Sequence, residues 1–164
     1  MDEGADSGDL LSQKRIKIEH EDDAGSLYEK VLVTSLDQIK TFLPQLQSRT
    51  YPRIPQDHST ATYWRKRSKK DGIIDFRMSS QSIYNLVRGL SHPYCGALIQ
   101  IGDQEIETWK SVEVFDIPEN IEPGQIIDVN NEKNHVLVKC NPNAIQLDIE
   151  PSKTKHFVKG AYII

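Results

Sequence analysis

The first residues of the chain combine carboxylates and glycines at a spacing that could support proton transfer. Residues 2–9 read Asp-Glu-Gly-Ala-Asp-Ser-Gly-Asp, with no hydrophobic segment before them. Glycine lets a backbone turn tightly and approach a ligand closely, and a carboxylate held in such a turn can take up a proton. Surface turns rich in Asp and Gly are also common, so this run alone leaves a purely structural role open.

Several separated motifs follow this run along the chain. They are Ala24–Lys30 (AGSLYEK), Tyr63–Arg67 (YWRKR), Asp71–Phe76 (DGIIDF), Tyr84–Leu90 (YNLVRGL), Pro93–Ala97 (PYCGA) and Trp109-Lys110. In this order the motifs resemble the folate-dependent formyltransferase family. Together with residues 1–9 they cover about residues 1–112, and they resemble the nucleotide-sugar N-formyltransferases more than the methionyl-tRNA enzymes. Residues 113–164 resemble the variable tail of the family only loosely.

The resemblance implies transfer of a formyl group from 10-formyltetrahydrofolate to a primary amine. It assigns a catalytic role to Asp6 and contacts with the pterin ring of the folate to Asp2, Glu3, Gly4, Ala5 and Asp6. In the family an Asn and a His from an upstream Asn-x-His-x-Ser-Leu-Leu-Pro segment complete the site, and that segment does not occur in this sequence. We therefore expect a truncated or split gene product that is inactive alone, with a separate chain as one possible source of the other half.

A basic cluster is the candidate acceptor site. Tyr63, Arg65, Lys66 and Arg67 lie in residues 51–80, which carry seven basic and three acidic residues. Such a cluster suits the diphosphate of a nucleotide sugar. A linker whose basic residues are merely solvated would have the same composition, so this alternative stays open. Residues 113–164 carry eight acidic and five basic residues, which disfavours binding to tRNA because phosphate contacts dominate such affinity. Methionyl-tRNA formyltransferase remains the first alternative function.

The elements that must position these residues follow from hydrophobic spacing. We expect one or two short strands over residues 10–18, a helix that starts with a capping box at Ser26–Glu29, and a second helical pattern over residues 36–46 that Pro44 should kink or end. A long linker then precedes a helix over residues 83–90, which the Ser91-His92-Pro93 sequence ends. Short strands are predicted over residues 97–101, 104–114, 125–129, 135–140 and 144–149.

These elements predict an α/β remnant followed by a mainly β region. Residues 1–50 are assigned to the end of a Rossmann-like catalytic domain, residues 51–78 to a basic linker loop, and residues 79–164 to a helix and a small barrel of the oligonucleotide/oligosaccharide-binding (OB) type. A non-catalytic OB-like binding module left by truncation is the alternative from another functional class.

Composition limits the remaining possibilities. Hydrophobic residues make up 37% of the 164 positions and charged residues 27%, a balance typical of soluble globular proteins. No secretory signal or membrane-spanning run is present, so we expect a cytoplasmic protein. The two cysteines lie far apart, and we expect no metal site and a buried Cys95. His92 is expected to cap the end of the preceding helix, and Trp109 and Trp64 to serve in packing.

Overall fold

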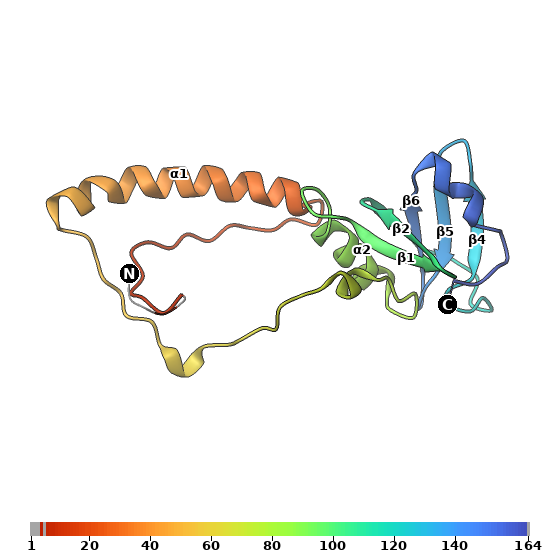
Figure 1. Cartoon of the computed structure of the whole chain (residues 1–164), viewed down its shortest axis with the longest axis horizontal. Coiled ribbons are helices and arrows are strands. Elements are labelled where there is room, and N and C mark those ends of the chain that lie inside the picture. The colour runs from red at the N-terminus through yellow and green to blue at the C-terminus, as the bar shows by residue number, and fades with distance from the viewer. Residues whose placement is uncertain (1–3, 5, 164) are drawn as a thin grey trace. The chain divides into compact units, whose positions relative to one another are not determined.

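The computed structural model describes residue 4 and residues 6–163, and the chain forms two compact units. The N-terminal unit consists of Met1–Glu21 and Ser26–Lys66, and the C-terminal unit of Asp22–Gly25 and Arg67–Ile164. Figure 1 shows one long helix in the first unit and most of the strands in the second. The two units differ in how they are stabilised, and each is described by itself.

The N-terminal unit is built around one helix, α1 (Ala24–Ser48). The helix runs through Pro44 to Ser48, so the predicted early end near Pro44 is wrong. A single proline removes one backbone N–H donor, and the other backbone hydrogen bonds of the helix still form on either side of it. The helix also begins at Ala24, which places Ser26 in its first turn and not at the predicted N-cap. The two helical patterns of the sequence therefore belong to one element.

The short strands predicted over residues 10–18 are absent from the described part of this unit. Leu10 forms only an isolated antiparallel bridge with Ile54, in which each backbone N–H donates to the other residue's carbonyl, at 2.8 and 3.1 Å. The expectation fails because no neighbouring strand is present to extend the ladder. The short 3₁₀ helix η1 (His58–Thr60) is the other regular element of the unit.

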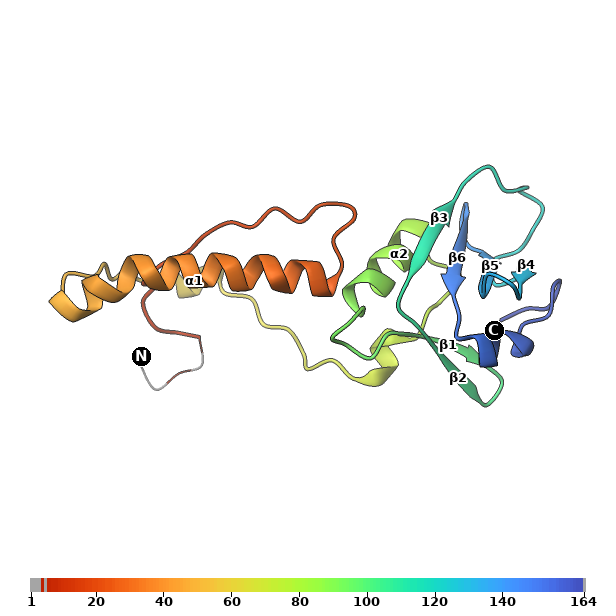
Figure 2. The same cartoon turned by 90° about the horizontal axis from the view of Figure 1, so that it is seen from above.

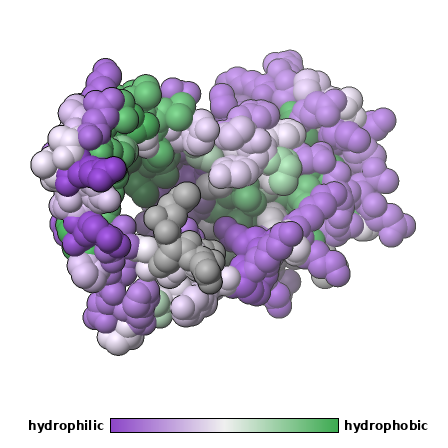
Figure 3. Space-filling view, turned by 60° about the vertical axis from the view of Figure 1, so that its left-hand side comes forward, coloured by the Kyte–Doolittle hydropathy of each residue, from purple (hydrophilic) through white to green (hydrophobic). Residues whose placement is uncertain are grey.

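The apolar stripe of α1 is exposed. None of the helix residues is buried, and Val33 and Leu36 are 68% and 58% exposed. Part of the hydrophobic surface of the chain is visible in green in Figure 3. Because an amphipathic helix gains most of its stability from packing its apolar face, α1 lacks the usual source of that stability among the described residues.

The C-terminal unit begins with residues that the sequence places in the linker. After the 3₁₀ helix η2 (Lys69–Gly72), Ile74 donates a backbone hydrogen bond to Leu98, at 2.8 Å. The side chains of Ile74 and Phe76 are 5% and 4% exposed and belong to the hydrophobic core. The core therefore starts before residue 79, because this segment pairs with a strand and is covered by it.

Helix α2 (Ser80–Gly89) confirms the helix predicted over residues 83–90. Ser79 caps its N-terminus by accepting a hydrogen bond from the backbone N–H of Ser82, at 3.1 Å. Ile83 and Val87, one turn apart, are fully buried. Their spacing of four places both side chains on the same face of the helix, against the core.

The strands form two antiparallel sheets, shown from a second direction in Figure 2. One is the hairpin of β1 and β2, and the other has the order β3-β6-β5-β4. The predicted strand over residues 104–114 is in fact two strands in different sheets, because Trp109 and Lys110 break the ladder. The bounds are β1 Ala97–Ile101, β2 Gln104–Thr108, β3 Ser111–Val114, β4 Ile126–Asn130, β5 His135–Lys139 and β6 Ala144–Asp148.

One continuous core joins these sheets to α2. Its fully buried side chains include Ile99, Val136, Val138, Ile145 and Leu147. The C-terminal segment after the 3₁₀ helix η3 (Pro151–His156) closes one side, where Ile126 donates to the carbonyl of Ala161 at 2.8 Å. The predicted fold class, a remnant followed by a mainly β, OB-like domain, is confirmed.

Candidate functional site

The Asp6 loop is held by a segment that lies about fifty residues further along the chain. Asp6 has a left-handed backbone, with φ +59°. The side-chain amide of Gln56 donates to the carbonyls of Asp6 and Gly8, at 2.9 and 2.7 Å. Asp9 accepts an ion-paired hydrogen bond from Arg53, at 2.9 Å. Residues 53–56 thus run antiparallel to residues 6–10 and fix the turn.

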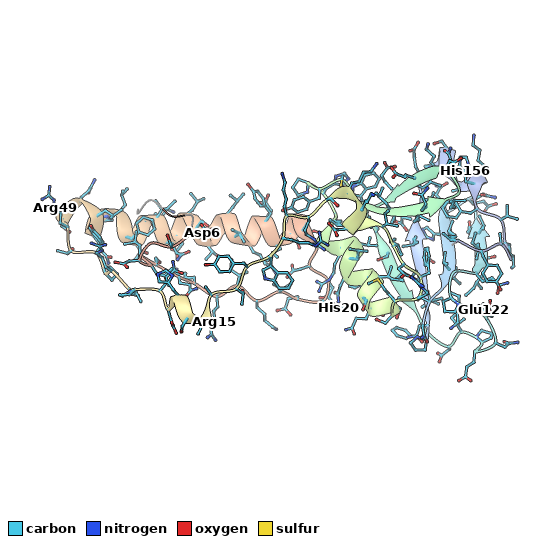
Figure 4. All side chains as sticks on the ribbon, turned by 60° about the horizontal axis from the view of Figure 1, so that its bottom comes forward. Asp6, Arg15, His20, Arg49, Glu122 and His156 are labelled. Atoms are coloured by element: carbon cyan, nitrogen blue, oxygen red, sulfur yellow. The ribbon has the colours of Figure 1, made fainter. Side chains whose placement is uncertain are left out.

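A pocket of about 930 Å³ opens beside this loop. The loop contributes one wall, which includes Asp6 (labelled in Figure 4), and the C-terminal part of α1 and the segment after it contribute the others. The pocket combines two carboxylates, an arginine and an amide with apolar surface from leucines, a proline and a tyrosine. Its lining residues are Gly4, Asp6, Gly8, Asp9, Leu10, Leu11, Leu46, Tyr51, Pro52, Arg53 and Gln56.

The predicted folate-binding residues lie only partly within this description. Gly4 and Asp6 line the pocket, whereas Asp2, Glu3 and Ala5 lie outside the described residues. The volume is within the range of ligand pockets for drug-sized molecules. A carboxylate, a loop backbone and an adjoining apolar wall suit a flat, polar heterocycle such as a pterin, so the residues present fit this group.

The predicted acceptor residues do not join this pocket. Tyr63 and Trp64 are 92% and 93% exposed, so the expected packing role of Trp64 is wrong. Arg65 and Lys66 are exposed at the end of the N-terminal unit, and Arg67 begins the C-terminal unit. Arg65, Lys66 and Arg67 lie in an extended stretch without regular structure, in which backbone constraints give no fixed direction to the side chains.

A second group of residues that drew attention in the sequence lies in the C-terminal unit. The rings of His92 and Trp109 stack with centroids 5.2 Å apart and an interplanar angle of 7°. The indole N–H of Trp109 donates to the carbonyl of Tyr94 at 3.2 Å. His92 therefore packs on an aromatic ring and is not the cap of α2, which ends at Gly89.

The two cysteines occupy opposite environments. Cys95 is exposed, so its predicted burial is wrong, whereas Cys140 is fully buried. Burial raises the pKa of the Cys140 thiol to about 11. Cys95 lies in the turn before β1, where few other side chains cover it. Its hydrophobic character therefore did not lead to its burial.

Two carboxylates that might be mistaken for a catalytic pair have structural roles. Asp75 accepts hydrogen bonds from the guanidinium of Arg77, which hold the pKa of Asp75 at about 2. Asp71 accepts a hydrogen bond from the backbone N–H of Ser68, at 2.6 Å, and completes the capping box of η2. Both aspartates stabilise turns, as their positions in the sequence indicate.

Among residue 4 and residues 6–163, no group of three or more His, Cys, Asp or Glu side chains could hold a metal ion. In the same part of the chain, no helix has the length and apolar character needed to cross a membrane.

Comparison with known proteins gives the chain its family. The model of the formyl transferase C-terminal domain matches residues 66–160, which is the C-terminal unit almost from end to end. The chain belongs to the formyl transferase family. The resemblance of the sequence motifs to this family is thereby confirmed.

A curated formyl transferase relative extends the match to the N-terminal unit. The bifunctional polymyxin resistance protein ArnA of Wigglesworthia glossinidia brevipalpis is 33% identical over 147 residues, which are 90% of this chain and 22% of ArnA. The chain thus spans about a fifth of this relative. The matched region lies within one longer chain there, so this similarity does not support the predicted separate chain.

Several solved structures share the fold. HypX from Aquifex aeolicus, in complex with tetrahydrofolic acid, has a TM-score of 0.62 at 16% identity, over 89% of this chain and 25% of HypX. The sugar 3N-formyl transferase WlaRD, solved in the presence of dTDP and 5-N-formyl-THF, has a TM-score of 0.64 at 19% identity, over 91% and 52%. The N-formyltransferase of Helicobacter canadensis, with folinic acid and dTDP-3-aminofucose, has a TM-score of 0.60 at 17% identity, over 92% and 53%.

Sequence reasoning missed the residues that hold the loop. Tyr51, Arg53 and Gln56 were assigned to a linker because no periodicity marks residues 51–66. One signal was available, since loops of that length are usually functional or disordered. Which loop residue would meet Gln56 depends on a contact between residues about fifty positions apart, and local spacing carries no information about such a contact.

Proposed function

We propose that the chain is part of an N-formyltransferase that moves a formyl group from 10-formyltetrahydrofolate to the amine of an amino sugar carried on a nucleotide. The observation that carries this proposal is the formyl transferase match over residues 66–160, preceded by a loop in which Asp6 lines a pocket. Residues 1–50 are then the end of the catalytic domain, and the C-terminal unit is its OB-like appendage.

The chemistry requires a group that accepts a proton near the attacking amine. The folate donor supplies an activated formyl carbon, and the amine must lose a proton as it attacks that carbon. Asp6 is the candidate in this chain, as the base itself or as the partner that keeps a histidine protonated. The Asn and His of the family motif do not occur in the sequence, so we propose that the isolated chain does not turn over.

Charge supports a nucleotide sugar as the acceptor in preference to tRNA. Residues 113–164 are net acidic, whereas a tRNA-binding tail should be basic. Arg65, Lys66 and Arg67 are three consecutive exposed basic residues, and their guanidinium and ammonium groups suit a diphosphate. Two of the solved relatives contain a dTDP nucleotide or sugar in their structures. The cytoplasm is the proposed location.

Calorimetry on the whole chain tests donor and acceptor binding separately. Folinic acid, a stable folate, should bind the wild type, and Asp6→Asn should weaken that binding. dTDP and UDP should bind through the basic cluster, and Arg65→Ala/Lys66→Ala/Arg67→Ala should weaken their binding. The control Lys14→Ala/Arg15→Ala/Lys17→Ala removes the same charge elsewhere in the N-terminal unit and should leave nucleotide binding unchanged.

Three results would overturn this proposal. Failure of the wild type to bind folinic acid would remove the donor assignment. Tight, salt-dependent binding of initiator tRNA, with none of dTDP or UDP, would favour the methionyl-tRNA formyltransferase alternative. Binding of an oligosaccharide by the C-terminal unit without any folate affinity would instead favour an OB-like binding module.

Turnover is testable in a longer protein in which the Asn-x-His-x-Ser-Leu-Leu-Pro segment precedes this chain. Asp6→Asn should lower kcat about 10²- to 10⁴-fold there, the usual contribution of a positioned acid–base group. Retained activity in that variant would contradict the catalytic assignment of Asp6.

A further inference from the structure

The segment that follows α1 contains one residue set apart by its environment. Across residues 51–66 every side chain is exposed except Gln56, which is half-buried. Its amide nitrogen carries two protons, and each has an acceptor, the carbonyl of Asp6 at 2.9 Å and that of Gly8 at 2.7 Å. A side chain with such complete use of its donors has a defined position, although the backbone around it is otherwise without helix or strand.

The two backbone carbonyls that Gln56 contacts belong to Asp6 and Gly8, the first and last residues of a short turn. Asp6, whose carboxylate is the candidate catalytic group, is therefore part of the turn that Gln56 binds. Asp6 has φ +59°, a left-handed conformation that is unfavourable for residues with a side chain unless local contacts stabilise it. One donor group that bonds carbonyls two residues apart restricts the turn between them. The direction of the Asp6 side chain is therefore coupled to the position of Gln56.

Two further contacts continue this pairing along both segments. Arg53 forms an ion pair with Asp9, with 2.9 Å between Nε and Oδ2. Leu10 and Ile54 exchange backbone hydrogen bonds at 2.8 and 3.1 Å. The antiparallel bridge between Leu10 and Ile54, together with the side-chain contacts of Arg53 and Gln56, makes residues 53–56 a clamp on residues 6–10. Arg53 and Gln56 also line the pocket.

We propose that Gln56 is a positioning residue for the Asp6 loop, and that Arg53 and Gln56 form part of one wall of the folate site. The segment expected to be a linker is then part of the donor-binding machinery. The positioning of the loop by Gln56 is a matter of contacts within this chain, whereas its effect on folate binding rests on the proposed function.

The test uses the whole chain labelled with ¹³C and ¹⁵N. Gln56→Glu keeps the shape but replaces both donors with an acceptor, so the carbonyl ¹³C resonances of Asp6 and Gly8 should shift and the contacts between residue 56 and the loop should be lost. Gln56→Lys restores donors and should recover much of the wild-type spectrum. Gln38→Ala is the matched control, since the Gln38 amide bonds Ser12 in the same unit, at 2.7 Å, away from the Asp6 turn.

Folinic acid titration supplies the functional readout. Gln56→Glu should weaken binding about tenfold, the effect of losing one or two neutral hydrogen bonds, whereas Gln38→Ala should not. Unchanged Asp6 and Gly8 resonances in Gln56→Glu would overturn the proposal, and so would equal changes in Gln38→Ala. If the wild type does not bind folinic acid, the proposed function fails, and the resonances still decide whether Gln56 positions the loop.

Discussion

The two helices of the chain show how differently its two units are stabilised. Helix α1 has 25 residues and buries none of them, whereas α2 has 10 residues and buries three. Both helices carry an apolar stripe, so the difference does not lie in the pattern of the sequence. It lies in whether a sheet is present to cover the stripe, which α2 has in β3 and β6.

Hydrogen bonds reinforce this contrast. The Asp6 loop is fixed by exposed or half-buried polar contacts, such as those of Gln56 and Arg53, which each contribute little net stability in water. The C-terminal unit combines ladder hydrogen bonds with a continuous apolar core. We therefore expect cooperative unfolding of the C-terminal unit and a shallow, non-cooperative loss of structure in the N-terminal unit.

Truncation of a leucine in each unit is the largest expected effect. Leu147 is fully buried in β6 and Leu43 on α1 is 48% exposed. Leu147→Ala should lower the free energy of unfolding by about 2–5 kcal/mol, because it leaves a cavity. Leu43→Ala should change it by no more than about 0.5 kcal/mol. Urea unfolding followed by tryptophan fluorescence measures both, and equal losses would refute the contrast.

Replacement of Pro44 examines the N-terminal unit alone. Proline inside a helix is about 3 kcal/mol less favourable than alanine, so Pro44→Ala should increase the helical circular dichroism signal at 222 nm. The midpoint of the cooperative urea transition should not move, because that transition reports on the C-terminal core. A shift of the midpoint would show that α1 belongs to the same cooperative unit.

A glycine in the C-terminal unit should also be sensitive. Gly124 has φ +91°, and a Cβ there would lie 2.7 Å from the carbonyl oxygen of Ile163. Gly124→Ala should destabilise the unit by about 1–3 kcal/mol, the usual range for backbone strain. Gly89→Ala is the matched control, since nothing lies within 4 Å of a Cβ at Gly89. A neutral Gly124→Ala, measured by thermal unfolding, would show that the C-terminal segment moves freely.

The smallest expected effect concerns pH. Arg77 holds the pKa of Asp75 at about 2 in the folded protein, below its ordinary value of 3.8, so the pair stabilises the unit above about pH 4. That contribution is lost as the pH falls through about 2. Because the Asp75 side chain is 44% exposed, Asp75→Asn should cost at most about 0.5 kcal/mol at pH 7.

Acid titration of wild type and Asp75→Asn measures this difference. The two stability curves should converge as the pH falls from 4 to 2. Asp37→Asn is the control in the N-terminal unit, where the hydrogen bond from Lys14 likewise lowers the pKa of Asp37, and it should leave the cooperative transition unchanged. A difference in the free energy of unfolding between wild type and Asp75→Asn that stays constant at every pH would mean that Asp75 acts through its shape and not its charge.

Elements with local signals could be predicted from the sequence. Strands β4, β5 and β6 lie within a residue of their predicted bounds, because alternating side chains and Asn-rich turns mark both faces and ends. Helix α2 was recognisable from its apolar spacing. Asp6 was singled out by a motif, and its place at a pocket agrees with that choice.

Elements that depend on a distant partner could not be predicted in the same way. Residues 10–18 have the composition of a strand but find no ladder, and Trp109-Lys110 divides one predicted strand between two sheets. Cys95 is small and apolar yet exposed, because its turn has no layer above it. In each case the outcome depends on which other segment lies alongside, and not on the residue types themselves.

Residue types and local spacing by themselves determined the family, the acidic loop with Asp6 and the mainly β character of the C-terminal unit, since these follow from motifs and periodicity that a folded structure does not alter. Only the tertiary structure decided that residues 53–56 hold the Asp6 loop, that Ile74 and Phe76 belong to the core, and that the stripe of α1 stays exposed. Long-range contacts produce all three, because the free energy of burial and of hydrogen bonding depends on both partners.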